Sequence, residues 1–119
     1  MRWSVCITAE AKSDLKDLDG SIKKQVLAGI YKISLAPLPA PNGYGKPLGN
    51  KAGSDLSGFF KIKYKGIGIR VIYTLVLEEK IINIVVISMR DDNYCYDLAE
   101  RLYRRYGAHI FTEIFELLE

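Results

Sequence analysis

The sequence predicts a small α+β domain in which helices pack on a small antiparallel sheet. Its 119 residues suit one domain, and its composition, 49% hydrophobic and 26% charged, is ordinary for a globular protein. Three strand-like runs follow one another directly, which is typical of an antiparallel meander. Two helical patterns precede these runs and one follows them. The predicted order is β-α-α-β-β-β-α with a C-terminal helical extension, and we expect all helices on one face of the sheet.

The N-terminal third predicts one strand and a helical hairpin. Residues 2–8 alternate between apolar and polar side chains, as a half-buried strand does. Thr8 can cap a helix over 9–19, and Ser21 can cap a second helix after the Asp19-Gly20 break. The second helix carries an apolar stripe that consists of Ile22, Val26, Ile30 and Ile33.

A segment rich in proline and glycine follows the hairpin. All four prolines fall within 37–47 and five glycines fall within 43–58, so we predict a loop over 37–57. A loop of about 20 residues in a small domain is usually functional, or it contains a missed element. The three strands then begin at residues 59, 69 and 81, with turns at "YKGIG" and "EEK" between them.

The C-terminal part predicts a helix and a helical tail. The run "RDDNYCYDLAERLYRRYG" has a helical pattern that Gly107 ends. We therefore divide the chain into a domain over 1–106 and an extension of the same domain over 107–119. The extension carries an apolar stripe that either folds back or binds a second copy or another protein: Ile110, Phe111, Ile114, Phe115 and Leu118.

Basic residues are concentrated in one part of the chain. The net charge is only +3, but the last twelve residues contain glutamates and no lysine or arginine. Lys61, Lys63 and Lys65 alternate along a predicted strand and therefore point to the same side. Arg70 interrupts the apolar run that follows. This arrangement predicts an anionic partner such as a nucleic acid.

Several classes of protein are excluded by composition. Two cysteines without CxxC spacing and a single histidine do not predict a metal site, and we expect no cofactor. The N-terminus lacks the apolar core of a secretion signal, and no apolar run is long enough for a membrane span. We expect a reducing, cytoplasmic setting and no membrane partner.

Four segments together resemble the RelE/ParE superfamily of toxins from bacterial type II toxin–antitoxin systems. They are "AEAKSDLKDLDGSIKKQV", "GKPLGN", "LSGFFKIKYKGIGIRVIYTL" and "IVVISMRDDNYCYDLAERL". The resemblance covers roughly residues 2–106. It implies one of two activities. RelE-type toxins cleave mRNA on the ribosome and so inhibit translation and growth, whereas ParE-type toxins share the fold and inhibit DNA gyrase.

The resemblance also implies a set of site residues. RelE-type sites contain two lysines on one strand, an arginine on the next strand, and an arginine and a tyrosine after the last strand. The matching residues here are Lys61, Lys63, Arg70, Arg90 and Tyr96. Their presence favours the RelE-type endoribonuclease over the gyrase inhibitor. We also expect Lys46 and Lys65 to contact RNA.

These residue types suit metal-independent RNA cleavage by the RNA's own 2′-hydroxyl. A cationic cluster stabilises the charge that develops on the phosphorane. Like charges disfavour protonation of a lysine among them, and the resemblance implies that Lys63 is the general base. Lys61 and Arg90 would hold the scissile phosphate, Arg70 would bind it bidentately, and Tyr96 would stack on a base or orient the 2′-hydroxyl.

Each residue also has a structural alternative. The two lysines can protect a sheet edge, Arg70 and Arg90 can form ion pairs within the fold, and Tyr96 can serve packing. Two aspartates, at 91 and 92, follow Arg90 where the superfamily commonly has a basic residue. They would weaken phosphate binding unless they point away.

The resemblance implies two partners, a cognate antitoxin and mRNA on the ribosome. The toxin and antitoxin would form a hetero-oligomer. Arg70 shares its strand face with Ile72 and Val76. We therefore expect an apolar patch beside the cations, and we expect the antitoxin to bind there. A decayed toxin that only binds its antitoxin is a third alternative.

Overall fold

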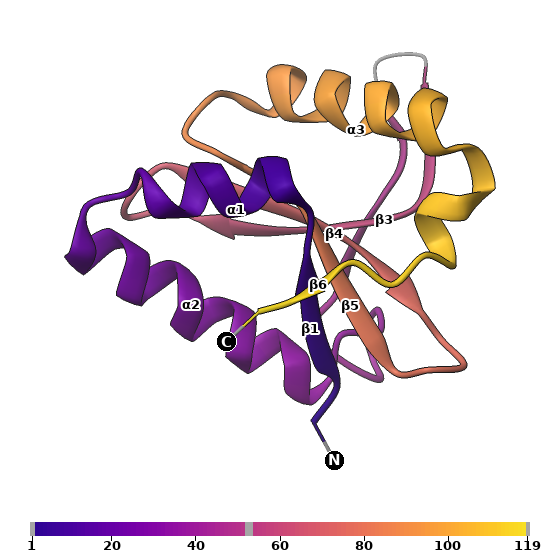
Figure 1. Cartoon of the computed structure of the whole chain (residues 1–119), viewed down its shortest axis with the longest axis horizontal. Coiled ribbons are helices and arrows are strands. Elements are labelled where there is room, and N and C mark those ends of the chain that lie inside the picture. The colour runs from indigo at the N-terminus through magenta and orange to yellow at the C-terminus, as the bar shows by residue number, and fades with distance from the viewer. Residues whose placement is uncertain (1, 52–53, 119) are drawn as a thin grey trace.

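The computed structural model describes residues 2–51 and 54–118, in which helices cover a six-stranded mixed sheet (Figure 1). Residues 52–53 of the predicted loop and Glu119 of the acidic tail lie outside the described ranges. The α+β class is confirmed. The elements are, in order, β1 (Ser4–Ile7), α1 (Ala9–Lys16), α2 (Gly20–Leu35), β2 (Lys46–Lys51), β3 (Ser54–Tyr64), β4 (Ile69–Val76), β5 (Ile81–Ser88), α3 (Asp92–Tyr106), the 3-10 helix η1 (Gly107–Phe111) and β6 (Glu116–Leu117).

The sheet has the strand order β2-β3-β4-β5-β1-β6. Strands β3, β4 and β5 form the predicted antiparallel meander, and β1 runs parallel to β5. The register sets Lys63 opposite Arg70, and Arg70 opposite Ser88. Residues directly opposite each other in an antiparallel pair share a face, so this register begins to assemble the site.

Helices lie on both faces of the sheet, so the prediction of a single covered face is wrong. One core joins α1 and α2 to the sheet through residues such as Val26, Ile30 and Tyr73. A second core joins α3 and η1 to the opposite face through Phe59, Ile72 and others. The physical reason is that β4 and β5 are apolar on both sides over most of their length, so the side chains on each face must be buried from water by other elements.

Local hydrogen bonds explain where the helices begin and end. Thr8 caps α1 as predicted, since its hydroxyl accepts a hydrogen bond from the Ala11 amide at 3.2 Å. Asp19, rather than the predicted Ser21, caps α2, because its carboxylate accepts from the Ser21 amide. Gly107 ends α3 with a positive φ of 58°, a backbone conformation that glycine adopts readily.

The predicted loop over 37–57 contains a missed element. Strand β2 pairs antiparallel with β3, and β3 itself begins at Ser54, five residues before the predicted start. Proline and glycine concealed the strand. Pro47 is tolerated because β2 lies at the edge of the sheet and needs hydrogen bonds on only one side, and the register shifts between Pro47 and Gly49.

The C-terminal tail folds back on the domain, but beyond η1 it does so as extended chain and not as the predicted helix. Strand β6 pairs with β1, and the Leu118 amide donates to the Val5 carbonyl at 2.9 Å. The fully buried Asn83 holds the preceding segment: its amide group donates to the Glu113 carbonyl and accepts from the Phe115 amide. Backbone partners on the open edge of β1 therefore outweigh the weak helical tendency of a short segment.

Across the described ranges, no helix has the length and apolar character that crossing a membrane requires.

Candidate functional site

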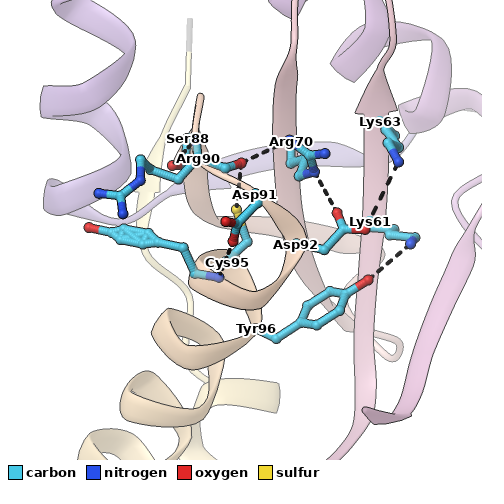
Figure 2. A network of polar contacts seen from close by, with 10 residues as sticks. Lys61, Lys63, Arg70, Ser88, Arg90, Asp91, Asp92, Cys95 and Tyr96 are labelled. Atoms are coloured by element: carbon cyan, nitrogen blue, oxygen red, sulfur yellow. Dashed lines mark hydrogen bonds and ion pairs between the residues drawn. The ribbon is translucent and has the colours of Figure 1, made fainter. Parts of the chain in front are cut away.

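The candidate site lies where β3 and β4 meet the N-terminal end of α3 (Figure 2). Lys61 and Lys63 are two residues apart on β3, so their side chains leave the sheet on the same side. Arg70, directly opposite Lys63 on β4, extends from that side as well. Alternation along one strand and register between two strands thus place three cations together.

Tyr96 closes one end of this cluster. It lies on the buried side of α3, and only 9% of the residue is exposed. Its hydroxyl accepts a hydrogen bond from Lys61 Nζ at 3.0 Å. The contact spans 35 positions of sequence, and it holds the lysine beside a phenol whose ring belongs to the core under α3.

Asp92 lies at the centre of the cluster. Its Oδ1 accepts a hydrogen bond from Arg70 Nε at 2.5 Å, and its Oδ2 lies 3.9 Å from Lys63 Nζ. Arg70 also donates through Nη1 to the Arg90 carbonyl at 2.8 Å. Two of the three cations are therefore engaged by one carboxylate, and Arg70 is held from two directions. The ion-pair alternative for Arg70 is the arrangement that the structure has.

Electrostatics keep Asp92 ionised. Partial burial opposes ionisation, but the hydrogen bond and charge of Arg70 outweigh it, and Lys61 and Lys63 add to the effect, so the pKa of Asp92 lies below its ordinary value. The first turn of a helix also favours an anion. Asp91 has a separate role, since its side chain caps α3 by accepting from the Tyr94 amide at 2.9 Å.

Arg90 contributes its backbone and not its charge. Its guanidinium lies over the Tyr94 ring, 4.3 Å from the centroid, and Figure 2 shows the side chain directed away from Lys61 and Lys63. The structure thus brings four of the five expected residues together in one cluster, all except Arg90. The direction of the Arg90 side chain could not be predicted from the sequence, because in the turn after β5 it depends on the neighbouring residues.

Basic residues extend from the cluster along the edge of the sheet. Lys46 on β2 is directly opposite Lys61, which places it next to the cluster. A depression of about 220 Å³ is lined by residues of α2, β2, β3 and the loop before β2, among them Lys32, Tyr44 and Lys46. Lys32 Nζ lies 4.9 Å from the centre of the half-exposed Tyr44 ring. Lys32 and Tyr44 had no sequence signal, since they come together only when the loop folds over α2. Lys65 is exposed in the turn after β3.

The apolar patch that the sequence predicted beside the cations is not open. Ile72 and Val76 are almost fully buried, with 1% and 7% of their surface exposed. Ile72 belongs to the core that α3 and η1 cover. The prediction that an antitoxin binds there is wrong for the chain as folded, because α3 and η1 already cover this face of the sheet.

A metal site is not apparent in the part of the chain that the structure describes. No three or more His, Cys, Asp or Glu side chains gather there in a way that could hold an ion.

Comparison with known proteins identifies the family. A profile described as "ParE toxin of type II toxin-antitoxin system, parDE" matches residues 5–94. The chain therefore belongs to the ParE toxin family of type II toxin–antitoxin systems, within the RelE/ParE superfamily. The match spans β1 to the start of α3 and includes most of the cluster. No curated protein matches the chain by sequence.

Solved structures of RelE toxins share the fold. A free-state mutant of E. coli RelE is 17% identical, with a TM-score of 0.68 over 86% of this chain and 98% of that one. The toxin–antitoxin complex RelBE2 of Mycobacterium tuberculosis is 26% identical, with a TM-score of 0.61 over 77% and 95%. The RelE–RelB complex of Pyrococcus horikoshii is 18% identical, with a TM-score of 0.53 over 74% and 94%. A ParE profile and RelE structures, from the two branches of the superfamily, thus both resemble this chain.

Proposed function

We propose that this toxin is a metal-independent endoribonuclease that cleaves mRNA on the ribosome and so inhibits translation and growth. The observation that carries the proposal is the 3.0 Å contact between Lys61 Nζ and the Tyr96 hydroxyl. It joins two of the expected site residues from a strand and a helix that lie far apart in sequence. Lys63 and Arg70 flank the same position.

The chemistry would proceed through the RNA's own 2′-hydroxyl. That oxygen loses its proton and attacks the adjacent phosphorus, while the bond to the 5′-oxygen breaks and that oxygen takes up a proton. Arg70 and Lys61 would stabilise the charge on the phosphorane, and Lys63 would act as the general base that accepts the first proton. Tyr96 would orient the nucleotide through its hydroxyl, and Arg90 would need to turn toward the phosphate.

The basic depression supports an RNA substrate. Lys32, Lys46 and Lys61 line it together, and they can follow a phosphate backbone. Tyr44 presents an exposed ring on which a base can stack. A single strand could then run from the Lys61–Tyr96 contact past β2, with Lys65 as a further phosphate contact. The ribosome would hold that strand in place and supply the entropic part of catalysis.

A second candidate, a ParE-like inhibitor of DNA gyrase, is favoured by Asp92 and Arg90. Asp92 neutralises part of the cationic cluster, and the Arg90 guanidinium is turned away from it. Both features reduce the charge available to a phosphate. The matching family profile also carries the ParE name.

An antitoxin is the expected protein partner under either activity. The RelBE2 and RelE–RelB structures are toxin–antitoxin complexes. We propose that a cognate antitoxin covers the basic cluster of this chain in a hetero-oligomer, and that the free toxin acts in the cytoplasm, where the ribosomes are. Negative side chains on the antitoxin would complement Lys61, Lys63 and Lys46.

The test is mRNA cleavage on programmed ribosomes, read by primer extension, with free RNA and gyrase supercoiling as parallel assays. Cuts that require the ribosome and are lost in Arg70→Ala would support the nuclease. Lys80→Ala, a change in a distant exposed turn, is the matched control and should cut like the wild type. Loss of supercoiling without any cut would instead assign the chain to the gyrase inhibitors.

A further inference from the structure

We propose that Asp92 determines how tightly this toxin binds RNA, because its carboxylate occupies the place that an RNA phosphate must take between Lys63 and Arg70. The inference rests on the proposed ribonuclease function for the identity of the ligand. Nothing in the family match or in the RelE-type site assigns a role to this residue.

The contacts of Asp92 are those that a bound phosphate would make. One carboxylate oxygen accepts from Arg70 Nε at 2.5 Å, and the other lies 3.9 Å from Lys63 Nζ. A carboxylate and a phosphodiester carry one negative charge each, and both offer oxygens to a guanidinium. The Asp92 side chain therefore stands where a non-bridging phosphate oxygen would bind.

Both anions cannot occupy this position together. Two like charges within a few ångströms repel, and more strongly at a half-buried site than in water. The side chains of Asp92 and Lys63 are each about one-third exposed, at 34% and 38%. RNA must therefore displace the carboxylate before Arg70 can bind a phosphate through Nε.

The position of Asp92 in α3 permits that displacement. Asp92 is the first residue of the helix, and its partly exposed side chain can turn to solvent by rotation about χ1. The start of the helix does not depend on it, since Asp91 provides the cap. Arg70 would remain held through Nη1 by the Arg90 carbonyl and would keep its direction. The site can thus exchange its own carboxylate for a phosphate.

A consequence is discrimination against free RNA. A free strand offers phosphates at low local concentration and competes poorly with a tethered carboxylate. A strand held by the ribosome is presented repeatedly to the same site and competes better. Asp92 would therefore suppress binding of RNA elsewhere in the cell while allowing it on the ribosome.

The chain contains a matched control for this proposal. Asp91→Asn and Asp92→Asn each remove one negative charge from adjacent residues at the same helix end. Asparagine is as good an N-cap as aspartate, so Asp91→Asn keeps the helix start. Only Asp92→Asn removes the ion pair with Arg70. Any difference in RNA affinity between the two variants therefore reflects the carboxylate beside Arg70 and not the net charge.

The experiment measures binding of a short, fluorescent, fully 2′-O-methylated single-stranded RNA by anisotropy, at about 50 and 150 mM salt. The ligand cannot be cleaved, so binding is read apart from chemistry. We expect Asp92→Asn to lower the Kd about tenfold, and Asp91→Asn to lower it less than about threefold. Adding Arg70→Ala to Asp92→Asn should remove the gain. Asp92→Ser provides a second variant, and thermal unfolding confirms that each protein is folded.

Equal gains from both asparagine variants would overturn the proposal, since net charge alone would explain them. Weaker or unchanged binding in Asp92→Asn and Asp92→Ser would also overturn it, because Asp92 would then support Arg70 and not compete with RNA. Ribosomal cleavage is assayed in parallel. If Asp92→Asn binds RNA more tightly but no cleavage is seen, the role of Asp92 is upheld and the nuclease is rejected. If mRNA is cleaved but Asp92→Asn binds RNA as the wild type does, the nuclease is upheld and the role of Asp92 is rejected.

Discussion

Lys61 Nζ donates a hydrogen bond to the Tyr96 hydroxyl at 3.0 Å, across the boundary between β3 and α3. The phenol is nearly buried, whereas the lysine is partly exposed. The contact therefore has an apolar side, which is the core under α3, and an open side toward the neighbouring lysines and Arg70. An RNA strand that enters from the open side would meet both partners at once.

Replacing Tyr96 by Phe should impair cleavage far more than stability. The ring and its packing remain, and only the hydroxyl that Lys61 contacts is lost. We expect ribosomal cleavage to fall about tenfold to a hundredfold, and the free energy of unfolding to change by about 1 kcal/mol or less. Tyr103→Phe on the same helix is the control, since Tyr103 is exposed at the distant end. Unchanged cleavage in Tyr96→Phe would remove the hydroxyl from the mechanism.

Tyr44 should contribute to RNA binding by stacking. We expect Tyr44→Ala to weaken binding of a short single-stranded RNA about tenfold, because stacking of a base on an aromatic ring contributes about 1–3 kcal/mol. Tyr44→Phe retains the ring and should bind like the wild type. Half of Tyr44 is exposed, so neither change should alter thermal stability much. A duplex RNA, whose bases are already stacked, should not distinguish these variants.

The Thr8 cap of α1 should make a measurable contribution to the free energy of unfolding. The Thr8 hydroxyl is buried and accepts from the Ala11 amide, so Thr8→Ala leaves that amide without its partner. We expect a loss of about 1 kcal/mol, and a fall in Tm of about 4 °C in thermal unfolding. Thr8→Ser keeps the acceptor and should recover most of the loss. Equal losses in the two variants would assign the effect to the missing methyl group.

Asn83 should anchor the C-terminal tail. Its buried side chain bonds two backbone groups, the Glu113 carbonyl and the Phe115 amide. Asn83→Ala leaves both unpaired and should cost about 2–3 kcal/mol. Hydrogen exchange should show faster exchange at the Phe115 and Leu118 amides, while the meander stays protected. Exposed Asn93→Ala is the control. Unchanged exchange in the tail would mean that β6 pairing alone holds it.

Acid should weaken the ion pair between Asp92 and Arg70. The pKa of Asp92 is lowered in the fold, so its contribution to stability is present above the ordinary carboxyl pKa of about 3.9 and is lost as pH falls through the lower folded value. The Tm difference between wild type and Asp92→Asn should therefore shrink below about pH 4. When both proteins also carry Arg70→Ala, the difference in Tm that Asp92→Asn causes should depend less on pH. A difference that stays constant down to pH 2, roughly the acid limit of such pairs, would contradict this.

Much of the fold could be predicted from local patterns. Alternation placed Lys61 and Lys63 on one side of β3, helical spacing placed Val26 and Ile30 on the core side of α2, and Thr8 and Gly107 marked helix ends. These features depend on the period of the backbone and on bonds between near neighbours. The sequence alone determined them, together with the family to which the chain belongs.

Only the tertiary structure decided which elements meet. Asp92 and Arg70 are 22 residues apart in sequence, and whether Asp92 points at Arg70 or away from it depends on how α3 packs against β4. The tail became a strand because the edge of β1 was open, and helices covered both faces because β4 and β5 are apolar on both sides. The period of an element sets the side from which a side chain leaves. The partner on that side is set by packing and by competition for hydrogen bonds between distant segments, and those are properties of the whole fold.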